Sequence, residues 1–216
     1  MKAEVEKCIR ENKVVAIIRG FDPDTCLRLA EAYLAGGIRA VEVTYAQAKP
    51  ECWRDTPTAI AAILKEFGKE MKVGAGTVLT RDQLNMTRDA GGEFMVTPNC
   101  RPELIRACVD LDMAALPGAL TPTEAVDAWD AGASFVKVFP AGQMGPGYVK
   151  ALKAPLAHIP MLAVGGVTLD NTADFMKVGC VGIAVSGPLT NREAIAAGQW
   201  DRITAVARAY VEKTRS

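Results

Sequence analysis

The chain has 216 residues, half of them hydrophobic, and its 25 Lys and Arg residues balance 25 Asp and Glu residues. This length fits one larger domain or two small ones, and the composition allows a sizeable core. The lack of a basic excess argues against a nucleic-acid-binding protein. The six cysteines form no C-x-x-C pair and there is one histidine, so we expect neither a disulfide framework nor a metal centre.

Targeting and membrane signals are the next features to consider. Residues 1–12 are polar and charged, unlike a signal peptide. No apolar run approaches the roughly 18–20 residues that a membrane helix needs. We therefore expect a cytoplasmic protein that does not act at a membrane.

Short apolar segments alternate with amphipathic segments of helix length along the chain. The expected strands cover residues 14–19, 40–44, 72–75, 93–97, 113–116, 134–139, 161–164 and 181–185. The expected helices cover residues 24–34, 58–67, 81–90, 102–111, 123–131, 147–154, 169–178 and 199–213. This alternation predicts a single (β/α)8 TIM barrel over residues 1–216. A doubly wound sheet fits less well, because no G-x-G-x-x-G motif follows the first expected strand.

The sixth expected strand, Phe135-Val136-Lys137-Val138-Phe139, is apolar except for one lysine. Because the side chains of a strand alternate between its faces, Phe135, Lys137 and Phe139 share one face. Burial in a parallel sheet covered by helices lowers the pKa of a lysine, by up to ~3–5 units when the group is fully buried. A neutral amine is a nucleophile toward a ketone. The alternative is an ordinary lysine whose ammonium group extends to solvent.

Glu42 is a second lone ionisable residue, flanked by Val41 and Val43 in the second expected strand. Strands two and six lie on opposite sides of an eight-stranded barrel, so inward side chains of Glu42 and Lys137 converge near the carboxyl ends, where TIM barrels carry active sites. An amine and a carboxylate that face one cavity make a nucleophile with a proton shuttle. The alternative is a buried structural ion pair.

Glycine-bearing loops follow the last two expected strands, at Gly165-Gly166 and Ser186-Gly187. Such loops let backbone N–H groups approach an anion, and in TIM barrels they often bind phosphate, although glycines also serve tight turns. Arg19 ends the first expected strand. Its planar guanidinium group is suited to bind a carboxylate or phosphate, or to form a salt bridge on the barrel rim.

These features belong to a longer set of motifs. The set comprises Gly36-Gly37-Ile38, Glu42-Val43-Thr44, Gly74-Ala75-Gly76-Thr77-Val78, Thr97-Pro98-Asn99, Pro117-Gly118, Lys137-Val138-Phe139-Pro140, Gly165-Gly166-Val167, Ser186 and Asp201-Arg202-Ile203. Over residues 14–211 the chain resembles the class I aldolases of the 2-keto-3-deoxy-6-phosphogluconate aldolase family. The resemblance implies a barrel enzyme that cleaves a 2-keto-3-deoxy-6-phospho sugar acid into pyruvate and glyceraldehyde 3-phosphate. It also implies a homotrimer that needs no cofactor.

The same resemblance assigns roles to individual residues. Lys137 is expected to form the Schiff base, and Glu42 is expected to act as the general acid and base. Thr77 and Pro98 are expected to contact the pyruvyl half, and Phe139 to form a wall beside the lysine. The expected phosphate ligands are Gly165, Gly166, Ser186 and Gly187.

Two positions depart from the pattern of many gluconate-type members. Ala46 replaces an arginine four residues after Glu42, and Val164 replaces a threonine before the Gly-Gly pair. We expect Arg19 to take over the anion-binding role of that arginine. The Ala-Val-Gly-Gly-Val form resembles more closely the branch that cleaves the galactonate epimer. The sequence leaves the preferred epimer open, and also whether 4-hydroxy-2-oxoglutarate is cleaved.

Two other functions remain open at this point. In the first, the barrel is a sugar-phosphate isomerase or epimerase, in which Glu42 moves a proton and Lys137 polarises a carbonyl without covalent bonding. In the second, the barrel only binds a ligand, and Glu42 and Lys137 form a structural pair. Release of pyruvate separates the aldolase from both.

Overall fold

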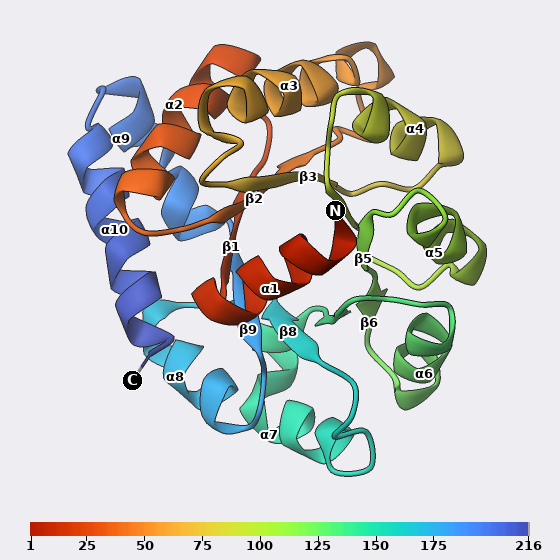
Figure 1. The fold of residues 1–216 in the computed structure, drawn as a ribbon. Coiled ribbons are helices and arrows are strands. Elements are labelled where there is room, and N and C mark those ends of the chain that lie inside the picture. Colours follow the sequence, from red (N-terminus) through yellow and green to blue (C-terminus); the bar gives the residue numbers. More distant parts are fainter. Residues whose placement is uncertain (216) are drawn as a thin grey trace.

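Short parallel strands form a barrel in the computed structural model, which describes residues 1–215 (Figure 1). The strands are β1 (Val14–Ile18), β2 (Ala40–Thr44), β3 (Lys72–Gly76), β4 (Phe94–Val96), β5 (Ala114–Leu116), β6 (Gly118–Ala119), β7 (Val136–Val138), β8 (Met161–Val164) and β9 (Gly182–Val185). Within the described residues, these nine strands form one sheet in the order β5-β4-β3-β2-β1-β9-β8-β7-β6. The TIM-like barrel predicted from the sequence is confirmed.

The ninth strand arises because Pro117 interrupts the fifth barrel strand between β5 and β6. Proline has no N–H group to donate to a strand ladder. The Pro117 carbonyl still accepts a hydrogen bond from Lys137 N at 2.8 Å, and Ala115 O accepts one from Ser134 N at 2.9 Å. β5 pairs with β4 and β6 pairs with β7, so the ring closes through this divided strand.

Helices cover the outside of the barrel (Figure 1). They are α2 (Pro23–Ala35), α3 (Asp55–Phe67), α4 (Arg81–Asp89), α5 (Pro102–Val109), α6 (Pro122–Asp130), α7 (Ala141–Lys153), α8 (Leu169–Lys177) and α10 (Trp200–Lys213). Capping boxes start three of them, with Thr80, Thr121 and Thr168 as the N-cap residues. Of the helices that the structure describes, none has the length and apolarity required to cross a membrane.

Some helical segments differ from the sequence pattern. α7 begins at Ala141 rather than at residue 147, because Gly145, with φ of 77°, and Pro146 break its periodicity. The sequence pattern also missed α1 (Lys2–Asn12) and the short α9 (Arg192–Ala196). Two 3₁₀ helices, η1 (Pro50–Cys52) and η2 (Gly187–Thr190), follow β2 and β9.

Alternate residues along the strands fill the barrel interior, together with Val5 and Ile9 of α1 (Lys2–Asn12). The interior cluster consists of Val5, Ile9, Val15, Ile17, Ala40, Phe94, Val96, Ala114, Leu116, Phe135, Leu162, Val164 and Ala184. Their strand neighbours, such as Val136 and Val138, belong to the larger cluster between the sheet and the helices. Glu42 and Lys137 each lie two positions after an interior residue, so the strand period directs both side chains inward.

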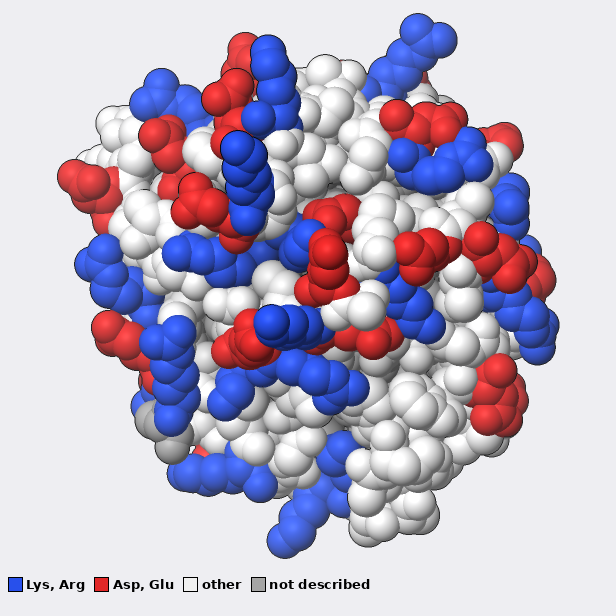
Figure 2. Space-filling view, viewed as in Figure 1, with Lys and Arg blue, Asp and Glu red and all other residues white. Residues whose placement is uncertain are grey.

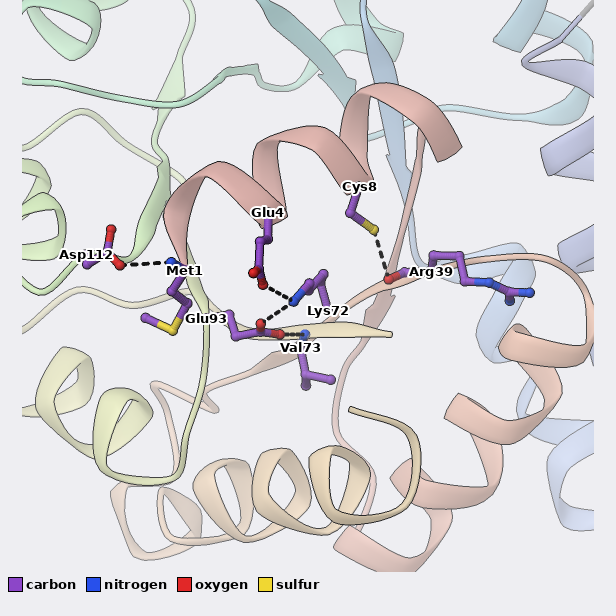
Figure 3. Close-up of polar contacts among 8 residues, drawn as sticks. All are labelled: Met1, Glu4, Cys8, Arg39, Lys72, Val73, Glu93 and Asp112. Atoms are coloured by element: carbon purple, nitrogen blue, oxygen red, sulfur yellow. Dashed lines mark hydrogen bonds and ion pairs between the residues drawn. The ribbon is translucent and has the colours of Figure 1, made fainter. Parts of the chain in front are cut away.

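α1 lies across one end of the barrel (Figure 1). Its Val5 and Ile9 side chains are fully buried in the interior cluster. Lys72 Nζ, at the start of β3, donates hydrogen bonds to Glu93 Oε1 at 2.7 Å and to Glu4 Oε2 at 3.0 Å (Figure 3). α1 therefore closes the end at which the strands begin, and leaves the opposite end for a site.

Charged side chains of both signs lie interspersed on the face that α1 crosses (Figure 2). The amino group of Met1 donates to Asp112 Oδ2 at 2.9 Å, and Cys8 Sγ donates to Arg39 O at 3.4 Å (Figure 3). The first contact precedes α1, and the second comes from its second half. They hold the helix against the strand starts in addition to its apolar contacts.

Candidate active site

β7 places the Lys137 side chain inside the barrel, on the same face as Phe135. The lysine is 6% exposed, and its Nζ lies 4.9 Å from the centroid of the Phe139 ring. Burial lowers the pKa of Lys137, and the Arg19 guanidinium lowers it further, whereas the Glu42 carboxylate opposes the shift. The ammonium group therefore does not extend to bulk solvent, and the amine is biased toward its neutral, nucleophilic form.

β2 places Glu42 in register between Ile17 of β1 and Gly74 of β3. Glu42 is 1% exposed, and neither of its carboxylate oxygens accepts a hydrogen bond from residues 1–215. Burial raises the pKa of Glu42, and attraction by Lys137 and Arg19 opposes this rise. Because a buried polar group without a partner is costly, this carboxyl group is better explained by a role with a bound molecule than by stability.

The glycines of β3 make room for this carboxyl group. A Cβ atom added at Gly76 would lie 2.3 Å from Glu42 Oε1 and 2.9 Å from Thr44 Cγ2. A Cβ atom added at Gly74 would lie 2.3 Å from Phe94 O. The two glycines of the Gly74-Ala75-Gly76 motif thus leave room for close packing, Gly74 against β4 and Gly76 against the Glu42 side chain.

Lys137 and Glu42 interact electrostatically without forming a hydrogen-bonded ion pair. Each favours the charged form of the other, yet Glu42 accepts no hydrogen bond from Lys137. A buried structural ion pair needs direct hydrogen bonds to offset the loss of hydration. The arrangement fits better an amine that attacks a carbonyl carbon and a carboxyl group that moves protons for it.

A cavity of about 350 Å³ opens at the carboxyl ends of β1, β7, β8 and β9. Its lining includes the predicted residues Arg19, Lys137, Phe139, Gly165, Gly166, Ser186 and Gly187, together with Val164. The structure therefore brings together the lysine, the arginine and both glycine-bearing loops. Within residues 1–215, no three His, Cys, Asp or Glu side chains cluster closely enough to hold a metal ion.

The Gly165-Gly166 loop is held by neighbouring helices. Both glycines have left-handed φ angles, 83° and 74°, which glycine adopts without strain. Gly142 N donates to Gly165 O at 2.7 Å, and Asn171 Nδ2 donates to Gly166 O at 3.0 Å. Sequence reasoning missed Gly142 and Asn171, although the Thr168-x-x-Asn171 spacing is a capping signal that marks the second.

Ser186 connects the other glycine-bearing loop to the first strand. Its Oγ donates a hydrogen bond to Ile17 O at 3.1 Å. Arg19 lies two residues farther along the chain, in the same cavity. Ser186 thus fixes the position of the loop relative to the strand that ends in the arginine.

Glu42, although buried in the same barrel, is not among the residues that line this cavity. Thr77 and Pro98, which follow β3 and β4, do not line it either. Thr77 has a left-handed φ of 55°, and its carbonyl accepts a hydrogen bond from Gln47 Nε2 at 2.5 Å. A Cβ atom added at Gly118 would lie 2.3 Å from Pro98 O, so Gly118 permits the close approach of the loop after β4. The expected contacts of Thr77 and Pro98 with the pyruvyl half stay predictions, and the sequence did not single out Gln47.

A family model, a curated protein and solved structures similar to this chain are described as aldolases of one group. A family model described as KDPG and KHG aldolase matches residues 5–206. The 2-dehydro-3-deoxy-6-phosphogalactonate aldolase of Escherichia coli K12 is 39% identical over 177 residues, which are 82% of this chain and 83% of that protein. A solved structure described as native KDPGal has 38% identity and a TM-score of 0.83, with 94% of each chain covered. The KDPG aldolase of Legionella pneumophila, with pyruvate captured as a covalent carbinolamine, has 25% identity and a TM-score of 0.84, with 95% of this chain and 97% of that chain covered.

Proposed function

Because the chain belongs to the KDPG and KHG aldolase family, we propose that it cleaves a 2-keto-3-deoxy-6-phospho sugar acid through an imine at Lys137. The products are pyruvate and glyceraldehyde 3-phosphate. The observation that carries this proposal is the buried Lys137 amine in a cavity at the carboxyl end of the barrel, with the unpartnered Glu42 carboxyl group inside the same barrel. The lysine itself supplies the electron sink, so the reaction requires no cofactor.

In this mechanism the neutral Lys137 Nζ attacks the C2 ketone and forms a carbinolamine. Loss of water gives an iminium ion, which withdraws electrons from C3. Glu42 accepts the proton of the C4 hydroxyl, directly or through water, and the C3–C4 bond breaks to release glyceraldehyde 3-phosphate. The enamine that remains is protonated at C3, and hydrolysis of the resulting iminium ion releases pyruvate and the free lysine.

The raised pKa of Glu42 suits the proton transfer. A general acid–base group works best when its pKa lies near the operating pH, and burial shifts the Glu42 pKa upward from its ordinary value. No group of residues 1–215 donates a hydrogen bond to its oxygens. Phe139, beside the Lys137 amine, screens that amine from solvent on one side.

Anionic groups at the two ends of the substrate would be held by different elements. The phosphate is assigned to the loops of Gly165, Gly166, Ser186 and Gly187, where backbone N–H groups can approach it. Arg19 is assigned to an anionic group of the substrate, in the role that an arginine at position 46 has in many gluconate-type relatives. Remote binding of these groups holds C2 next to the Lys137 amine.

We further propose that the galactonate-derived epimer is the preferred substrate. Val164 lines the cavity and is 3% exposed, and it cannot offer the C4 hydroxyl the hydrogen bond that a threonine offers there. The similarity to a 2-dehydro-3-deoxy-6-phosphogalactonate aldolase supports the same choice. The difference between the epimers lies at C4, next to the bond that breaks.

The test compares pyruvate release from the gluconate-derived and galactonate-derived 6-phospho acids. The wild-type chain should release pyruvate from both, with the higher kcat/KM on the galactonate compound. Glu42→Gln should lower kcat by about 10²–10⁴-fold, the usual contribution of a general acid–base group, and Lys137→Met should abolish cleavage. An isomerised sugar phosphate without pyruvate would refute the aldolase mechanism, and a higher kcat/KM on the gluconate compound would refute the choice of epimer.

A further inference from the structure

A pair of glutamine side chains ties the loop after β2 to the loop after β3. Gln47 Nε2 donates to Thr77 O at 2.5 Å, and Gln83 Nε2 donates to Gln47 Oε1 at 3.1 Å. Gln83 is fully buried, and its Oε1 accepts a hydrogen bond from Leu79 N at 2.8 Å. The Gln47 amide is therefore fixed at one end by α4 and presents its N–H group to the Thr77 carbonyl.

Thr77 needs such a contact because of its backbone. A φ of 55° is uncommon for a residue that carries a Cβ atom, and such conformations persist only where neighbouring groups hold them. The residue before it, Gly76, lies against the Glu42 carboxyl group, 2.3 Å from Oε1 when measured from an added Cβ. The Thr77 carbonyl that Gln47 contacts belongs to the peptide between Thr77 and Val78. Val78 N, on the other side of the same peptide, donates to Val96 O of β4 at 3.2 Å.

The loop that carries Gln47 is also held by contacts that do not involve the Gln47 side chain. Trp53 Nε1 donates to Ala46 O at 3.1 Å, and the Tyr45 hydroxyl donates to Gln83 O at 3.0 Å. The Tyr45 and Trp53 rings meet edge to face, with centroids 6.3 Å apart. Loss of the Gln47 amide should therefore leave the loop in place and affect mainly the Thr77 peptide.

We infer that Gln47 is a positioning residue, which holds the Thr77 backbone in the orientation that receives the pyruvyl half of the substrate. This inference rests on the proposed function, in which Lys137 forms the imine, and on the contact of Thr77 with the pyruvyl half that the family resemblance implies. Gln47 itself does not touch the substrate. It acts through the hydrogen bond to the Thr77 carbonyl. Loss of Gln47 should therefore weaken the binding of pyruvate and leave the binding of the phosphate-bearing aldehyde unchanged.

The test measures the two halves of the substrate separately in Gln47→Ala and in the nearly isosteric Gln47→Glu, which removes the N–H donor. In the condensation direction, the KM for pyruvate should rise about tenfold, roughly the effect of one lost hydrogen bond, whereas the KM for glyceraldehyde 3-phosphate should stay within about twofold. The rate of borohydride trapping with subsaturating pyruvate should fall in parallel. Glu51→Gln, at an exposed position of the same loop, is the matched control and should change neither value.

A double-mutant cycle with Thr77→Gly supplies the second readout. Glycine adopts φ near 55° without strain. Gln47→Ala should therefore raise the KM for pyruvate much less in the Thr77→Gly background than in the wild type. Additive effects, an unchanged KM for pyruvate, or an equal rise in both KM values would overturn the inference. Failure of the wild-type chain itself to be trapped would instead refute the proposed function.

Discussion

Two buried carboxylates in this barrel differ in their hydrogen bonding, and the difference separates structure from chemistry. Glu93 accepts hydrogen bonds from Lys72 Nζ and from Val73 N, at 2.7 and 3.2 Å, near the closed end of the barrel. Glu42, near the open end, accepts none from the described residues. A buried carboxylate with hydrogen-bond donors is tolerated in a stable fold, whereas one without them is destabilising and requires another explanation. The same reasoning applies to Lys137, whose pKa is lowered by burial.

A buried amine should destabilise the fold in a way that depends on pH. In the Glu42→Gln background, Lys137→Met is expected to raise the free energy of unfolding near neutral pH by about 1–4 kcal/mol, the range found when buried ionic groups are replaced by apolar ones. The folded-state pKa of Lys137 is lowered, so the unfolded chain binds its proton more readily than the folded one. The destabilisation of the fold by the buried Lys137 amine is greatest at a pH below its folded-state pKa. It disappears above the ordinary lysine pKa of about 10.4.

Urea unfolding from neutral pH to about pH 10 checks this prediction, because the advantage of methionine should shrink as the pH approaches the ordinary lysine value. Lys150→Met, at an exposed position of α7, is the control and should show no such trend. A methionine variant that is less stable at neutral pH, or an advantage that grows with pH, would contradict the assignment of Lys137 as a buried amine with a lowered pKa.

At the scale of elements, the two ends of the barrel have different tasks. α1 closes the end where the strands begin, with apolar side chains in the interior and charged side chains at the rim (Figure 3). Burial alone would lower the pKa of Lys72, but its hydrogen bonds with Glu93 and Glu4 raise it. The opposite end carries the glycine-bearing loops and the cavity. Between the two ends lie Glu42 and Lys137, whose pKa values are shifted chiefly by burial.

We expect apolar contacts, and not ion pairs, to hold α1 in place. Ile9→Ala should lower the free energy of unfolding by about 2–5 kcal/mol, as is typical of a large-to-small change at a fully buried position. Glu4→Gln should cost much less than Ile9→Ala, because the Glu4 side chain is 71% exposed and its ion pair is screened by solvent. Denaturant unfolding of both variants gives the comparison. Equal losses, or a larger loss for Glu4→Gln, would show that the ion pair dominates.

At the scale of the whole molecule, much of the barrel could be predicted from the sequence because each strand is a separate apolar segment of few residues. The strand period also predicted that Phe135, Lys137 and Phe139 share a face, and the structure confirms it. The division of the fifth strand follows from Pro117, which has no N–H group to donate to the strand ladder. α1 has only two buried residues, Val5 and Ile9, in a polar segment, which is too little for a clear helical pattern.

The supporting contacts of the site could not be predicted in this way. Gln47 and Thr77 are 30 residues apart in the chain, and only the pairing of β2 with β3 brings them together. Gly142 and Gly166 approach each other for the same kind of reason, since α7 meets the loop after β8. Local periodicity carries no information on such contacts. The homotrimer and the cytoplasmic location also stay predictions.

The most direct test of the central claim is peptide mapping after borohydride reduction in the presence of pyruvate. The imine at Lys137 should be trapped as a stable adduct on the peptide that contains this lysine. Activity should fall in proportion to the fraction of the enzyme that carries the adduct. Without pyruvate, activity should persist. An active enzyme that gives no adduct, or an adduct on a lysine other than Lys137, would contradict the account.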